Sequence, residues 1–111
     1  MKLKYILNQI LFHFFQYPRI IRYKLLSVKW HKKGTYIRQP VLCRGKGYIY
    51  IGKSYMGVQA SPYFFSTYIY LEARNKNSKI IIGDYTHINN NLTIISEGAG
   101  ILIGNRVLMG T

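Results

Sequence analysis

The last third of the chain carries a hydrophobic position about every six residues. The positions are Ile82, Ile88, Ile94, Ile103 and Met109, with three extra residues before Ile103. A strand that alternates between core and solvent would repeat every two residues, and residues 80–111 do not follow that period cleanly. A period of six is typical of a short strand plus a turn, repeated along a stack of coils. We therefore expect the five aliphatic side chains to point inward.

Three Ile-Gly pairs add to this pattern, at Ile51-Gly52, Ile82-Gly83 and Ile103-Gly104. Glycine after each aliphatic position suits a corner, because it adopts positive φ at little cost. Three walls of six residues close a coil of about 18 residues. The intervals between the pairs, 31 and 21 residues, are longer. We expect loops where the excess falls, at residues 61–70 and 97–100.

The N-terminal segment has a helical pattern instead. Apolar side chains recur at spacings of three and four from Leu3 to Phe14. Pro18 interrupts the pattern and suits the first turn of a new helix, and Gly34 suits a helix stop. The pattern predicts two short helices that meet near Pro18. The uninterrupted apolar run is shorter than the roughly 20 residues that span a membrane.

Charge separates these two parts of the chain. Sixteen Lys and Arg against three acidic residues give a net charge of +13. Eight basic residues and no acidic residue lie in residues 1–33, whereas residues 80–111 have a net charge of −1. Nucleic-acid modules usually carry their basic surface on the folded module itself, so nucleic acid is not the expected partner. The basic segment is either a helical cap with a solvated face or a contact with an anionic membrane surface, and the two can coexist.

The length of 111 residues fits a single small protein with two parts. We expect a basic amphipathic helical arm at residues 1–33 and a β repeat at residues 34–111 that is incomplete at its C-terminal end. The single cysteine, Cys43, excludes an internal disulfide and a cysteine-based zinc site.

The repeats resemble the hexapeptide-repeat acyltransferases. The resemblance is carried by Ile82-Gly83-Asp84, by the segment 89–94 and by the segment Ile103 to Gly110. It implies a mainly β fold, a left-handed parallel β-helix, here preceded by a short basic helical arm. Within that family the segments look like the sugar O-acetyltransferases, including galactoside and maltose acetyltransferases and those of capsule and O-antigen synthesis.

The resemblance also implies a function. Members of this branch transfer acetyl from acetyl-CoA to a sugar hydroxyl, without a metal, and assemble as homotrimers. For this chain it implies a role in synthesis of a surface polysaccharide (capsule, O-antigen or exopolysaccharide), in the cytoplasm or at the inner face of the membrane. The partners would be a sugar or polysaccharide acceptor and two further copies of the chain.

Four residues match functional positions of the family. Asn89 matches an asparagine beside the catalytic histidine that orients the acceptor, and its amide can both donate and accept hydrogen bonds. His87 and Glu97 match acceptor-binding positions. Gly110 matches a small residue that flanks the pantetheine arm of CoA. The alternatives are an asparagine ladder in a turn for Asn89 and a solvent-facing wall position for His87.

The general base of the family, a histidine about one coil after the segment 107–110, has no match here. His13 and His31 lie in the arm, and His87 lies two coils too early. This predicts an N-terminal portion or a truncated form of an acetyltransferase, and leaves open whether the chain is an enzyme. The alternative is a non-catalytic trimeric β-helix that acts as a binding or scaffold protein. A γ-type carbonic anhydrase, which shares the fold, needs three metal-binding histidines and is not favoured.

Overall fold

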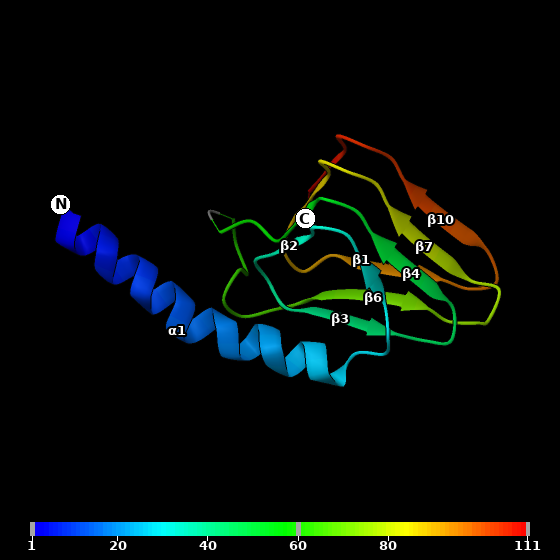
Figure 1. Cartoon of the computed structure of the whole chain (residues 1–111), viewed down its shortest axis with the longest axis horizontal. Coiled ribbons are helices and arrows are strands. Elements are labelled where there is room, and N and C mark those ends of the chain that lie inside the picture. The colour runs from blue at the N-terminus through cyan, green and yellow to red at the C-terminus, as the bar shows by residue number, and fades with distance from the viewer. Residues whose placement is uncertain (1, 60, 111) are drawn as a thin grey trace.

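The computed structural model describes residues 2–59 and 61–110, which form one long helix and three small parallel sheets (Figure 1). The helix is α1 (Lys2–Leu26). The first sheet consists of β1 (His31–Lys32), β4 (Tyr48–Ile51), β7 (Lys79–Ile82) and β10 (Gly100–Ile103). The second consists of β2 (Tyr36–Ile37), β5 (Tyr55–Met56), β8 (His87–Ile88) and β11 (Leu108–Met109). The third consists of β3 (Val41–Arg44), β6 (Ile69–Ala73) and β9 (Thr93–Ser96).

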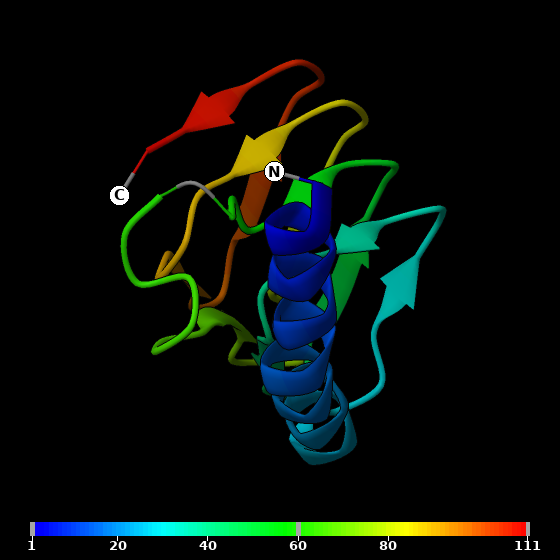
Figure 2. The same cartoon turned by 90° about the vertical axis from the view of Figure 1, so that its left-hand side faces the viewer.

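Consecutive strands belong to the first, second and third sheet in turn, and one such round of three strands is called here a pass. Each strand pairs in parallel with the strand of the preceding and following pass, so that β4 lies between β1 and β7, and β8 lies between β5 and β11. Figure 2 shows the strands of the second sheet stacked in this order. Equivalent positions of successive passes therefore lie side by side, although they are far apart in sequence.

The aliphatic positions of the sequence pattern do point inward. Ile82, Ile88 and Ile94 are buried, and Ile103 and Met109 are half-buried and pack against the same core. The register explains the period, because each position stacks on its equivalent in the neighbouring pass, as Ile82 pairs with both Ile51 and Ile103. The result is one continuous apolar core enclosed by the three sheets.

The residue after each Ile-Gly pair links the corners of successive passes. The Asp84 carboxylate accepts a hydrogen bond from the Lys53 backbone N–H at 2.9 Å, and the Asn105 side-chain oxygen accepts one from the Asp84 N–H at 2.8 Å. A Cβ on Gly52 or Gly83 would collide with these same oxygens. Glycine is thus required at these two positions because successive passes approach closely there. The Asp84 carboxylate is engaged in a structural hydrogen bond with the Lys53 backbone.

The predicted fold class, a mainly β chain forming a left-handed parallel β-helix behind a short helical arm, is wrong. Helix makes up 23% of the residues beside 32% strand. The sheets are unequal, because the strands of the second sheet have two residues each and β6 has five. Between β5 and β6 the described residues, 57–59 and 61–68, form no strand; this segment is called here the loop at residues 57–68. The six-residue period of residues 80–111 therefore does not extend regularly over the earlier passes.

The prediction of two helices meeting near Pro18 is also wrong, because α1 continues through Pro18. Contacts on both sides of the proline hold the helix on the body. Phe12 stacks on Phe64 with ring centroids 5.5 Å apart, and Tyr23 stacks on Tyr68 at 4.7 Å. Packing of one helical face thus outweighs the loss of one helical hydrogen bond at the proline. In the described part of the chain no helix is both long and apolar enough to cross a membrane.

Replacing Ile88 by Ala should lower the free energy of unfolding by about 2–5 kcal/mol, because the side chain is fully buried and leaves a cavity. Ile95→Ala is the matched control, since Ile95 is 43% exposed on the outer side of β9. Its expected effect is below about 1 kcal/mol. Urea denaturation of both variants measures the difference, and equal losses would contradict the inward placement of Ile88.

Candidate functional site

Aromatic rings form a ladder along the outer side of the second sheet. Tyr36 of β2 stacks on Tyr55 of β5, with ring centroids 4.8 Å apart, and Tyr55 stacks on His87 of β8 at 4.7 Å. The three residues are paired in register across the strands, so the ring spacing follows the spacing between neighbouring strands. The stacking fixes the orientation of the rings and leaves their polar edges, the tyrosine hydroxyls and the imidazole nitrogens, available for other contacts.

A cleft of about 330 Å³ lies beside this ladder. It is lined by Arg38, Tyr55, Gly57, Val58, Gln59 and His87. The lining combines a guanidinium group, a carboxamide, a phenol and an imidazole. These groups can donate several hydrogen bonds to a ligand, and Arg38 and Gln59 extend from loops rather than from strands. The ladder supplies a rigid wall of the cleft, and the two loops supply the rest.

The Asn90 side chain anchors the loop that contributes Val58 and Gln59 to the cleft. Its side chain is buried and lies against Val58, Ser61 and Pro62. The Asn90 carboxamide oxygen accepts a hydrogen bond from the Val58 N–H at 2.8 Å, and its NH₂ group donates to the carbonyls of Val58, Ser61 and Pro62 at 2.8–3.2 Å. Asn90 thereby replaces the strand pairing that the loop lacks.

Two buried glutamines complete the anchoring of the same loop. The Gln39 NH₂ group donates to the Tyr63 carbonyl at 2.9 Å and to the Thr67 carbonyl at 3.1 Å. Gln16 of α1 donates to the carbonyls of Arg38 and Phe64, both at 2.9 Å. The loop is therefore tied to the first pass, to the helix and to the turn after β8.

The sequence analysis singled out Asn89 rather than Asn90. Asn89 is half-buried in the turn after β8, where its side-chain oxygen accepts a hydrogen bond from the Asn90 N–H at 2.7 Å. It does not line the cleft that contains His87. The sequence does indicate a buried position for Asn90, because a residue two places after the inward-pointing Ile88 lies on the same side of an extended segment.

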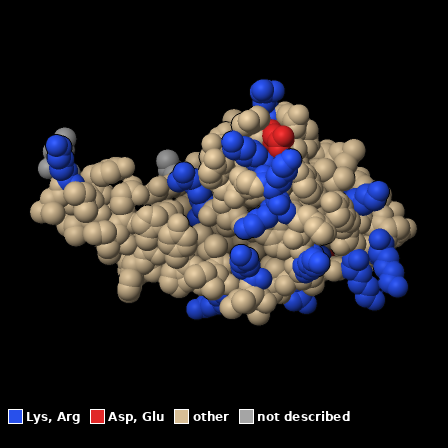
Figure 3. Space-filling model, viewed as in Figure 1, with Lys and Arg blue, Asp and Glu red and all other residues tan. Residues whose placement is uncertain are grey.

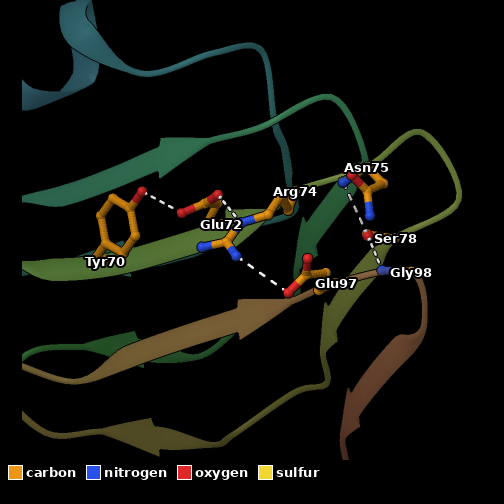
Figure 4. Close-up of polar contacts among 7 residues, drawn as sticks. All are labelled: Tyr70, Glu72, Arg74, Asn75, Ser78, Glu97 and Gly98. Atoms are coloured by element: carbon orange, nitrogen blue, oxygen red, sulfur yellow. Dashed lines mark hydrogen bonds and ion pairs between the residues drawn. The ribbon is translucent and has the colours of Figure 1, made fainter.

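Glu97, the second predicted acceptor contact, lies in a separate network beside the third sheet (Figure 4). Its carboxylate forms an ion pair with Arg74 at 3.2 Å, and Arg74 also contacts Glu72 at 2.7 Å. The Tyr70 hydroxyl donates to Glu72 at 2.6 Å. The Arg74 hydrogen bond, with that of Tyr70, lowers the pKa of Glu72, and the bond to Glu72 raises the pKa of Tyr70. The structure therefore does not bring Glu97 together with His87.

Gly110 is exposed and follows β11, with open space where a Cβ would lie. Cys43 is buried, and burial raises the pKa of its thiol to about 12, which removes it as a nucleophile.

Each of the three histidines stacks on a tyrosine ring. His13 stacks on Tyr17 at 4.9 Å, and His31 stacks on Tyr48 at 5.0 Å, as His87 does on Tyr55. Within residues 2–59 and 61–110 no histidine hydrogen-bonds to a carboxylate. A carboxylate of that kind commonly orients the histidine of a general-base pair. His87 belongs to the aromatic ladder and lines the cleft beside it. His13 lines a separate cleft between α1 and residues 35–38, and His31 lies on β1 of the first sheet.

No protein-family model, no curated protein and no solved structure matches this chain. What the cleft can bind therefore has to be inferred from the groups that line it.

Asn90→Ala should lower the free energy of unfolding by about 1–3 kcal/mol, because it leaves buried backbone groups of the loop without partners. Asn89→Ala removes a single hydrogen bond and should cost about 1 kcal/mol or less. Thermal denaturation of the two variants, with amide hydrogen exchange in residues 57–68, measures the difference. A larger loss in the Asn89 variant would contradict the anchoring role of Asn90.

Proposed function

We propose that this chain takes part in O-acetyl transfer from acetyl-CoA to a sugar hydroxyl in the synthesis of a surface polysaccharide. In this proposal its own residues supply the acceptor-binding side of the reaction. The observation that carries the proposal is the cleft beside His87, one of the residues predicted to contact the acceptor. Its lining suits a saccharide, because the polar edges of Tyr55 and His87 are combined with the hydrogen-bond donors of Arg38 and Gln59, which can engage vicinal hydroxyl groups.

The charge of the cleft favours an acidic acceptor. Arg38 is exposed at its edge, no acidic residue lines it, and the chain as a whole has a net charge of +13. A guanidinium group binds a carboxylate through two parallel hydrogen bonds. A uronic acid residue would place its carboxylate at Arg38 and its hydroxyls toward Gln59 and His87.

The chemical step needs more than this cleft. An alcohol becomes an effective nucleophile when a general base removes its proton, and such a base is typically worth about 10²–10⁴-fold in rate. His87 is the only histidine that lines the cleft, and it lacks a carboxylate partner in the described residues. We therefore expect saccharide binding by this chain without measurable acetyl transfer. The proposed place of the chain is the cytoplasm or the inner face of the membrane.

His87→Ala should weaken binding of a uronic-acid disaccharide about tenfold, the effect of losing one good contact. Arg38→Ala should do the same and should abolish the preference for the acidic disaccharide over its neutral counterpart. His31→Ala is the matched control, because it also removes an exposed histidine stacked on a tyrosine, but from β1 on the first sheet. Titration calorimetry gives the affinities, and circular dichroism checks that each variant is folded.

Three other outcomes would overturn parts of the proposal. Equal binding by the wild type and both cleft variants would remove the saccharide site from this cleft. Acetyl-CoA consumption by the wild type that is lost in His87→Ala would instead make His87 the general base. Saccharide binding without acetyl-CoA binding would favour the alternative of a non-catalytic binding or scaffold protein.

A further inference from the structure

The outward face of α1 is apolar along its whole length. The residues of this face, called here the apolar stripe, are Leu3, Leu7, Ile10, Phe14, Tyr17, Ile21 and Leu25. Their spacings of three and four residues place them on one side of the helix. Their exposed fractions lie between 49% and 80%. The stripe is therefore a continuous apolar surface that nothing in the described structure covers.

The opposite face of α1 already has its partners, and several of them are polar. Gln16 is buried and binds backbone carbonyls, and Arg19 donates to the Thr67 carbonyl at 2.5 Å. Ser27, just after the helix, accepts a hydrogen bond from the Cys43 N–H at 2.9 Å. The side of α1 that faces the body thus combines these polar groups with the aromatic rings of Phe12 and Tyr23, whereas the outward side is apolar, where a surface helix is usually polar. Packing on the body therefore does not account for the stripe.

The N-terminal half of α1 projects from the body, as Figure 1 shows. Next to the stripe, Leu11 and Phe15 help to line an apolar cleft of about 530 Å³ between the helix and Phe65. Phe15 and Phe65 are both more than half exposed. The apolar surface thus continues from the helix onto the loop at residues 57–68.

Basic residues lie at both ends of the stripe. Lys2 and Lys4 flank its first residue, Leu3, and Arg22 and Lys24 lie in the last turns of α1, close to its last residue, Leu25. Residues 1–33 contain no acidic residue. Figure 3 shows the same arrangement, with blue side chains at the tip of the helix and on the body and an uncharged stretch of helix between them.

We propose that α1 lies on an anionic membrane surface, with the apolar stripe in the boundary between headgroups and acyl chains. At about 1.5 Å per residue the helix is about 37 Å long and presents its whole stripe to one plane. The flanking lysines and arginines neutralise lipid phosphates at the same time. A second copy of the chain fits less well, because it would bring two basic arms together without an acidic residue to pair with them. This inference concerns a different surface from the cleft and does not depend on acetyl transfer.

The test is sedimentation with vesicles of phosphatidylcholine alone and of phosphatidylcholine mixed with phosphatidylglycerol. We expect binding to the mixed vesicles only, weakening as salt rises. The variant Leu7→Gln/Ile10→Gln/Phe14→Gln should lose at least about tenfold in binding, because it removes the centre of the stripe. Its matched control is Ile95→Gln/Leu102→Gln/Leu108→Gln, which changes three exposed apolar residues on the strands.

Charge is tested separately. Lys4→Glu/Arg22→Glu/Lys24→Glu should reduce binding to the mixed vesicles at least as much as the stripe variant. Lys46→Glu/Lys76→Glu/Lys79→Glu makes the same change of net charge on the body and should retain most of the binding. Equal losses in each variant and its control would overturn the proposal, as would equal binding to neutral vesicles. A stable oligomer in sedimentation velocity that requires the stripe, without vesicle binding, would identify a second copy as the occupant instead.

Discussion

Three buried carboxamide side chains, those of Gln16, Gln39 and Asn90, connect parts of the chain that no sheet connects. They come from α1, from the turn after β2 and from the turn after β8, and all three bind the loop at residues 57–68 or its immediate neighbours. The loop has no strand partners, so its buried carbonyls need donors from side chains. Because each NH₂ group serves two or more carbonyls, removal of one amide leaves several buried groups unsatisfied. The position of the helix and one side of the cleft both depend on these contacts.

The positions of the core residues could be predicted from the sequence, because burial in this body follows local patterns. The inward placement of Ile82 and Ile88 follows from the six-residue period, and the corner after Ile82 follows from the Ile-Gly pair there. The loop expected at residues 61–70 overlaps the irregular segment up to residue 68, although Ile69 and Tyr70 already belong to β6. Each of these features is decided by residues within one pass of the chain or by the repetition of a pass.

The features that the sequence analysis missed depend on contacts between distant segments. The continuity of α1 through Pro18 results from packing against residues near Phe64, which the helical pattern alone does not contain. Asn90 anchors a loop about thirty residues earlier in the chain. The neighbouring Asn89 is the same residue type but has no contact with that loop, so the sequence alone does not distinguish the two. The cleft beside His87 needs the register of β2, β5 and β8, which brings residues of three passes together. The proposed saccharide site is thus a product of register and loop anchoring, whereas the apolar stripe of α1 could be recognised from spacing alone.

A saccharide bound in the cleft beside His87 would perturb the residues that line the cleft. The most direct measurement is the mapping of amide and side-chain chemical shifts during titration with the uronic-acid disaccharide, for which a chain of 13.0 kDa is well suited. Binding in this cleft predicts saturable shifts that are confined to Arg38, Tyr55, Val58, Gln59 and His87 and their neighbours. Shifts centred on Arg74 and Glu97 instead, or no saturable shift near His87, would contradict it.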